Sequence, residues 1–73
     1  GFSFVVFPNP ASKLFTILLK TNLDAVPITV YDVYGKQIFF KTTSSKLSVD
    51  VSHWSKGVYF GVVDNQSFKI IVQ

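Results

Sequence analysis

Residues 57–72 read GVYFGVVDNQSFKIIV, and this stretch decides the fold. It contains two runs of apolar and β-branched residues, 57–63 and 67–72, and each run has the length of a strand. Asp64 and Asn65 stand between the runs, and both residue types favour tight turns. We therefore predict a β-hairpin here, with no helix in this part of the chain.

Similar runs, separated by turn residues, continue toward the N-terminus. The five further predicted strands are residues 2–7, 13–20, 27–34, 36–43 and 47–51. Seven short strands at about ten-residue spacing predict an all-β fold, an Ig-like antiparallel β-sandwich of about seven strands. We expect its core to contain Phe15, Ile17, Ile28, Val30, Val49, Val51, Trp54, Tyr59 and Val63.

The composition limits the class of protein. The chain has 73 residues, the size of one domain, so residues 1–73 are expected to form a single domain. Its charged residues are seven lysines, spread evenly, and four aspartates, with no arginine for bidentate contacts to bases or phosphates. We therefore expect no nucleic-acid partner. No apolar run approaches the ~20 residues of a membrane helix, so we also expect no membrane insertion.

Groups suited to catalysis or metal binding are scarce. His53 is the single histidine and the one candidate general base near neutral pH, with Ser52, Ser55 and Asp50 as neighbours in sequence. A catalytic triad is defined by geometry and not by such proximity, so we predict no catalytic residue and no enzyme activity. Cysteine is absent and the four aspartates stand apart, so we predict no metal site and no cofactor.

Several residues have a direct structural interpretation. Pro8 and Pro10 withhold backbone donors and end the first strand. Gly35 supplies a positive φ in a hairpin, beside Asp32, which accepts hydrogen bonds from turn amides. Tyr59, which follows closely on a glycine, is typical of a tyrosine corner, in which the phenol hydroxyl ties a loop to the sheet. These roles explain much of the sequence without any partner.

Residue chemistry alone leads to a small recognition or structural module. Trp54, Tyr31, Tyr34 and Tyr59 are residue types that form sugar-stacking platforms, although such aromatics more often lie in the core or on strand faces of a sandwich. An Ig-like adhesive or carbohydrate-binding module of a surface protein is therefore one alternative, and a plain spacer domain is another.

Four motifs carry a resemblance to a known family. They are FPNPAS at residues 7–12, VYDVYGKQI at 30–38, VDVSHWSKGVYF at 49–60 and FKIIVQ at 68–73. In this order and spacing they resemble the type A C-terminal sorting domains of the type IX secretion system of Bacteroidetes. Trp54, Gly61 and Lys36 depart from the residues that are commoner in that family, which are leucine, a larger side chain and arginine.

The resemblance implies a function, partners and a site. Domains of that family carry a secreted cargo from the periplasm across the outer membrane to the cell surface or the medium, and a sortase usually removes them. The implied partners are the outer-membrane translocon, a shuttle protein and the sortase. Within the family, the recognition determinants concentrate in the last two motifs. The expected recognition residues are Pro8, Asn9, Pro10, Asp32, Gly35, Lys36, Gly57, Val58, Tyr59, Lys69, Ile71 and Val72.

The two end strands also predict how the domain associates. Residues 2–7 and 68–72 have high β propensity and low charge. An exposed edge at either strand favours a homodimer or a strand-swapped dimer at high concentration. The last strand is further expected to offer its backbone to a receptor, as in β-augmentation.

Overall fold

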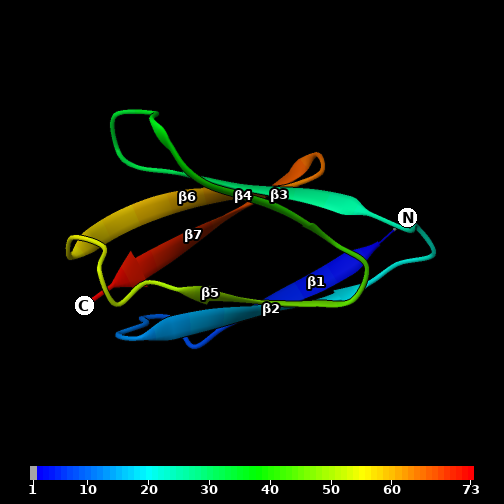
Figure 1. The fold of residues 1–73 in the computed structure, drawn as a ribbon, viewed down its shortest axis with the longest axis horizontal. Helices are drawn as coiled ribbons and strands as arrows, with labels where there is room; N and C mark the ends of the chain where they lie inside the picture. The colour runs from blue at the N-terminus through cyan, green and yellow to red at the C-terminus, as the bar shows by residue number, and fades with distance from the viewer. Residues whose placement is uncertain (1) are drawn as a thin grey trace.

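A computed structural model describes residues 2–73, which form seven strands (Figure 1). Gly1 lies outside the described residues. The strands are β1 (Ser3–Phe7), β2 (Leu14–Lys20), β3 (Val26–Tyr31), β4 (Gln37–Thr43), β5 (Lys46–Asp50), β6 (Gly57–Val63) and β7 (Gln66–Val72). No residue between 2 and 73 is helical, and each strand overlaps a predicted run, so the all-β prediction is confirmed.

The strands form two antiparallel sheets, which lie one above the other as the layers of a sandwich (Figure 1). The three-stranded sheet has the order β1-β2-β5, and the four-stranded sheet has the order β4-β3-β6-β7. β1 and β7, the first and last strands of the chain, are therefore both edge strands. This arrangement confirms the predicted antiparallel β-sandwich.

Alternate side chains of both sheets meet between the layers and form the core. The buried hydrophobic residues are Ala11, Phe15, Ile17, Leu19, Val26, Ile28, Val30, Val49, Val51, Tyr59, Val63, Ile70 and Val72. They include every predicted core residue except Trp54, which is only partly buried. Trp54 lies in the loop after β5, at the end of the sandwich, where its ring packs against Tyr59 at 4.9 Å and Phe15 at 6.4 Å between centroids.

The turn between β3 and β4 begins earlier than predicted. β3 ends at Tyr31 and not at residue 34. The reason is Asp32, whose Oδ1 accepts the backbone N–H groups of Tyr34 and Lys36, both at 2.9 Å. Gly35 has a φ of 82°, which a residue with a β-carbon rarely adopts. The predicted roles of Asp32 and Gly35 in this turn are confirmed.

The segment between β1 and β2 joins the two sheets. After β1 in the three-stranded sheet, the chain passes to the four-stranded sheet, where Ala11 forms a parallel bridge with Val72. The Ala11 N–H donates to the Ile71 carbonyl, and the Ala11 carbonyl accepts the N–H of Gln73, each at 2.8 Å. The Phe7–Pro8 and Asn9–Pro10 peptide bonds in this segment are cis. The segment thus borders β7 on the side away from β6.

Candidate recognition site

Parts of all four sequence motifs gather at one end of the sandwich. Asp32 in the β3–β4 turn and Gly57 at the start of β6 line a common hollow of about 220 Å³. Gly57 pairs with Val72 at the end of β7, and Asn9 binds β7 from its other side. Figure 1 shows the β3–β4 turn, the start of β6 and the C-terminus at the same end of the molecule. Folding therefore gathers motifs that are far apart in the sequence.

The side chain of Asn9 binds the backbone of β7 twice. Its Nδ2 donates to the Lys69 carbonyl at 2.8 Å, and its Oδ1 accepts the N–H of Ile71 at 3.0 Å. We call residues 9–11 the strap, because Ala11 binds the next backbone groups of the same edge. The strap engages the Lys69 carbonyl, both backbone groups of Ile71 and the N–H of Gln73. The predicted exposure of the β7 backbone is thereby limited to the part of the edge around Ser67.

Pro8, Pro10 and Lys36, which belong to the predicted recognition site, lie in the segment before β2 and in the β3–β4 turn. Pro8 and Pro10 are exposed and flank Asn9 in the strap. Lys36 is exposed, and its backbone closes the β3–β4 turn: its N–H donates to Asp32, and its carbonyl accepts the Asp32 N–H at 3.0 Å. The two prolines restrict the backbone on either side of Asn9, and Lys36 closes the β3–β4 turn, at the end of the molecule where the motifs gather.

Tyr59 forms the predicted tyrosine corner. Its hydroxyl donates to the Ser55 carbonyl, which lies in the loop that leads into β6. Tyr59 is buried, and its ring packs against the Trp54 indole. Gly57, between the loop and the strand, has a φ of 150°. The Tyr59 side chain therefore serves the fold and is not available to a partner.

Strand alternation divides the remaining motif residues into two sets. Tyr59 and Val72 point between the sheets and are buried. Val58 pairs directly opposite Ile71, and both lie on the outer face of the four-stranded sheet, where they remain partly exposed. Lys69 is on this outer face too and is exposed. The structure thus brings Val58, Lys69 and Ile71 together on one accessible surface.

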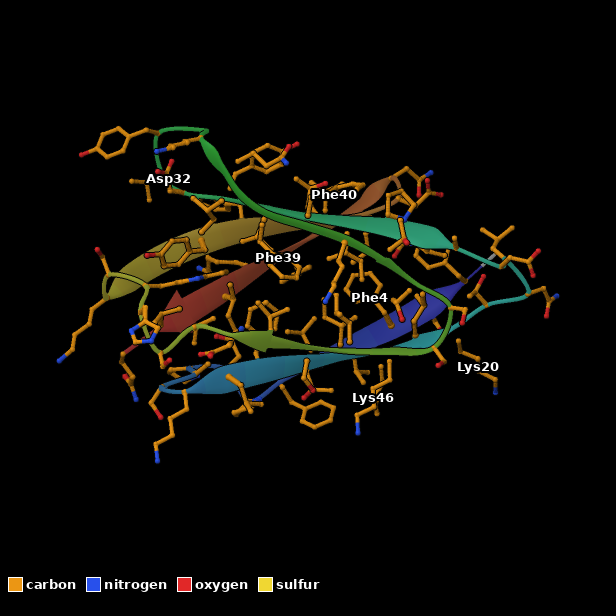
Figure 2. All side chains as sticks on the ribbon, in the orientation of Figure 1. Phe4, Lys20, Asp32, Phe39, Phe40 and Lys46 are labelled. Atoms are coloured by element: carbon orange, nitrogen blue, oxygen red, sulfur yellow. The ribbon has the colours of Figure 1, made fainter. Side chains whose placement is uncertain are left out.

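The same outer face carries aromatic residues that are absent from the predicted site. Phe60 lies directly opposite Lys69 on β7 and opposite Tyr31 on β3, and 45% of its surface is exposed. Phe40 on β4 extends the apolar surface, and Figure 2 shows it outside the sheet, whereas Phe39 points between the layers. The pairing of the strands brings these residues together, since Phe60, Tyr31 and Phe40 are far apart in the sequence.

Asp50 and His53 lie near the loop that leads from β5 into β6. Asp50, at the end of β5, accepts the Ser52 hydroxyl at 2.6 Å and the Ser52 N–H at 2.9 Å, and these hydrogen bonds hold the pKa of Asp50 below its ordinary value. His53 is exposed in the adjacent loop. Among residues 2–73, no three His, Cys, Asp or Glu side chains gather in a way that would hold a metal ion. Over the same range, no helix is long and apolar enough to cross a membrane.

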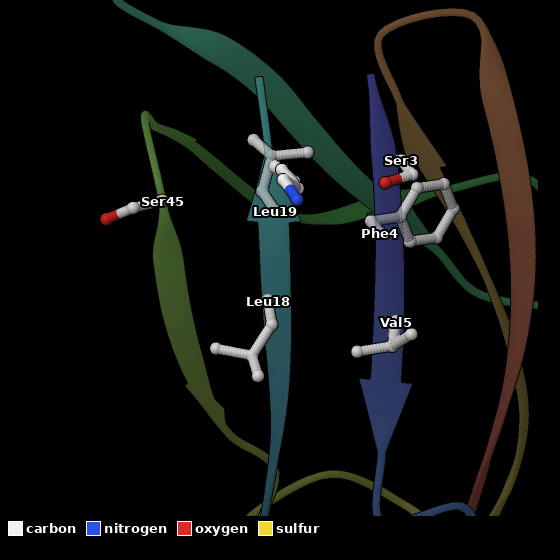
Figure 3. Close-up of a pocket in the computed structure, with 7 residues that line it drawn as sticks. Ser3, Phe4, Val5, Leu18, Leu19 and Ser45 are labelled. Atoms are coloured by element: carbon white, nitrogen blue, oxygen red, sulfur yellow. The ribbon is translucent and has the colours of Figure 1, made fainter. Parts of the chain in front are cut away.

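The four aromatic residues considered for a sugar platform, Trp54, Tyr31, Tyr34 and Tyr59, do not share one exposed surface. Tyr31 faces outward from β3, opposite Phe60. Tyr59 is buried, Trp54 is tilted by 51° against it, and Tyr34 projects from the β3–β4 turn with 92% of its surface exposed. A separate shallow hollow lies on the three-stranded sheet, beside Val5 and Leu18 (Figure 3). The first and third motifs begin in this sheet, at Phe7 of β1 and Val49 of β5.

Comparison of the sequence with known proteins identifies one family and one similar protein. Residues 5–73 match a family described as "Secretion system C-terminal sorting domain". A stretch of 34 residues, 47% of this chain, is 59% identical to part of a protein named "Endo-acting ulvan lyase" from Formosa agariphila. The matched stretch covers 6% of that lyase's length, so the similarity concerns only a small part of it. No solved structure is significantly similar to this chain.

Proposed function

Because this chain belongs to the family of C-terminal sorting domains of the type IX secretion system, we propose that residues 1–73 act as one sorting unit that the outer-membrane translocon, the shuttle protein and the sortase bind in turn. The cargo passes through the periplasm and ends on the cell surface or in the medium. The domain acts as the sorting signal and is not catalytic, so any enzymatic activity belongs to the cargo.

The convergence of the motifs at one end of the sandwich supports this proposal. The strap, the β3–β4 turn and the β6–β7 hairpin come from distant parts of the sequence, and they meet around Gly57 and Val72. Structural needs account for Asp32, Gly35 and Tyr59. They do not account for Val58, Lys69 and Ile71, whose side chains face outward. We assign recognition to these three residues, within the broader set of motif residues.

A reporter fusion tests the function. The 73-residue segment is joined to the C-terminus of a periplasmic reporter and expressed in a bacterium with an intact type IX system. We expect the reporter on the surface or in the medium, and we expect it to remain in the periplasm when the translocon gene is deleted. Reporter that stays in the periplasm of the intact strain, although the domain is folded, would refute the proposal.

We further propose that the isolated domain self-associates through its edge strands. β1 is an edge of the three-stranded sheet, and the β7 edge is open around Ser67. An edge strand with unpaired backbone groups favours pairing or exchange with a second copy. Sedimentation velocity over a range of concentrations should show a dimer at high concentration. A single monomeric species at about millimolar protein, far above typical micromolar association, would argue against it.

A further inference from the structure

The outer face of the four-stranded sheet presents a row of side chains across three strands. Tyr31 on β3 pairs with Phe60 on β6, and Phe60 pairs with Lys69 on β7. Val58 and Ile71 form the neighbouring pair, one step closer to the motif-bearing end. Directly opposed residues of this kind lie about 5 Å apart, so the five side chains form one continuous surface.

Lys69 is the only charged residue of this surface. Its neighbours on the outer face are Phe60 across the strand and Ser67 and Ile71 along it, and none is acidic. Asp32, at the end of β3, already accepts two backbone N–H groups of its own turn. The ammonium group therefore stands beside apolar side chains without a carboxylate next to it on this face.

The backbone of β7 is less available than these side chains. The strap engages the outward groups of β7 from the Lys69 carbonyl to the Gln73 N–H. A partner that added a strand to this edge would have to displace the strap or use only the part around Ser67. Side chains on the sheet face require no such displacement.

We propose that the sorting machinery reads the outer face of β3, β6 and β7 through side chains, and that its docking surface is a protein groove with apolar walls and a carboxylate that pairs with Lys69. The inference rests on the function proposed above and adds the chemistry of the partner. Phe60 and Tyr31 contact the apolar walls of the groove, and the ion pair of Lys69 with the carboxylate fixes the orientation of the domain in the groove. Burying the Lys69 ammonium group without an anion is costly, so a partner that provides a carboxylate binds better than one that does not.

The three-stranded sheet offers a matched control. Its outer face has a similar row, in which Val5 on β1 pairs with Leu18 on β2, and Leu18 pairs with Lys46 on β5. Leu18 is 41% exposed, close to the 45% of Phe60. Figure 2 shows Lys46 outside that sheet, on the opposite side of the molecule from Phe40. Asp50 lies on the same face of β5 but four residues away, opposite Leu14, so Lys46 also stands beside apolar side chains and the two rows are alike in chemistry.

The test compares export of the reporter fusion carrying Phe60→Ser or Lys69→Glu with export of the fusion carrying Leu18→Ser or Lys46→Glu. All four positions are on outer faces, and the melting temperature of each purified variant reports whether it is folded. We expect Phe60→Ser and Lys69→Glu to lower the exported fraction by about tenfold or more. We expect the other pair to be exported like the unmodified fusion.

The outcomes separate this inference from the proposed function. If the unmodified fusion is exported but folded Phe60→Ser and Lys69→Glu are exported equally well, the assignment of this face is wrong and the sorting function stands. Equal losses in all four variants would also overturn it. Co-sedimentation with phosphatidylglycerol–phosphatidylethanolamine vesicles gives a further check: binding that Lys69→Glu abolishes would replace the protein groove by a lipid surface.

Discussion

The ring of Phe68 lies directly over Gly61, its cross-strand partner, in the space that a β-carbon at position 61 would occupy. The same ring makes edge contacts with Phe4 on β1 and Phe15 on β2, each at 6.0 Å between centroids. β7 is thereby fastened to the opposite sheet. A side chain larger than that of glycine at position 61 would overlap the Phe68 ring.

Gly61→Ala is therefore expected to destabilise the domain although alanine is normally tolerated in strands. The added methyl group would force the Phe68 ring away from Phe4 and Phe15, and overpacking of this kind typically costs about 1–3 kcal/mol. Urea denaturation measures the loss. In a Phe68→Leu background the same substitution should cost much less, and an undiminished cost there would show that the ring is not the cause.

Tyr59→Phe is expected to loosen the loop before β6 while leaving the core intact. The substitution removes the hydrogen bond from the phenol to the Ser55 carbonyl, and a bond of this type contributes about 1 kcal/mol to the free energy of unfolding. Tyr34→Phe is the matched control, because Tyr34 is almost fully exposed and its change should stay within about 0.5 kcal/mol. Equal stability of the two variants would contradict the role of the corner.

Asn9→Ala is expected to release the strap from β7. It removes two hydrogen bonds, so local opening of this edge should become easier by about 1–2 kcal/mol. Amide hydrogen exchange reports this directly, with faster exchange at the N–H of Ile71. Asn22→Ala, in the loop between β2 and β3, provides the control. Unchanged protection of Ile71 in the Asn9 variant would show that the side chain does not hold the edge.

Ser52→Ala is expected to raise the pKa of Asp50 toward its ordinary value. The Ser52 hydroxyl is the largest cause of the lowered pKa of Asp50, followed by the Ser52 N–H. Because the folded-state pKa lies below the unfolded one, the contribution to stability is complete above the unfolded pKa and is lost as pH falls through the folded pKa. A carboxyl NMR titration measures the shift. Ser48→Ala, whose hydroxyl contacts Thr16 instead, should leave Asp50 unchanged.

The positions of the strands can be predicted from this sequence because the physical signals are local. In β5, Leu47 and Val49 alternate with Ser48 and Asp50, and such alternation marks a strand with one buried face. The bounds are less predictable where a side chain intervenes. The hydrogen bonds from turn amides to Asp32 are predictable, but the apolar residues Val33 and Tyr34 that follow it extend the predicted strand beyond its observed end at Tyr31.

The recognition surface is much less predictable, because it depends on long-range pairing. The predicted core residues Tyr59 and Val63 place Val58 and Phe60 on the other face of β6, but the sequence does not tell which residues of the neighbouring strands lie beside them. The register with β7, which places Phe60 opposite Lys69, provides the answer. Asn9 reads locally as a turn residue between two prolines, and its partners lie 60 and 62 residues away.

One measurement decides whether the last strand carries the sorting signal: the fraction of reporter that reaches the cell surface with and without residues 69–73. We expect the complete fusion on the surface and the truncated fusion in the periplasm. Lys69→Ala, which should change stability by no more than about 0.5 kcal/mol, should also remain in the periplasm. Leu18→Ser, on the outer face of the other sheet, should be exported. Normal export of the truncated fusion would contradict the sorting function assigned to β7.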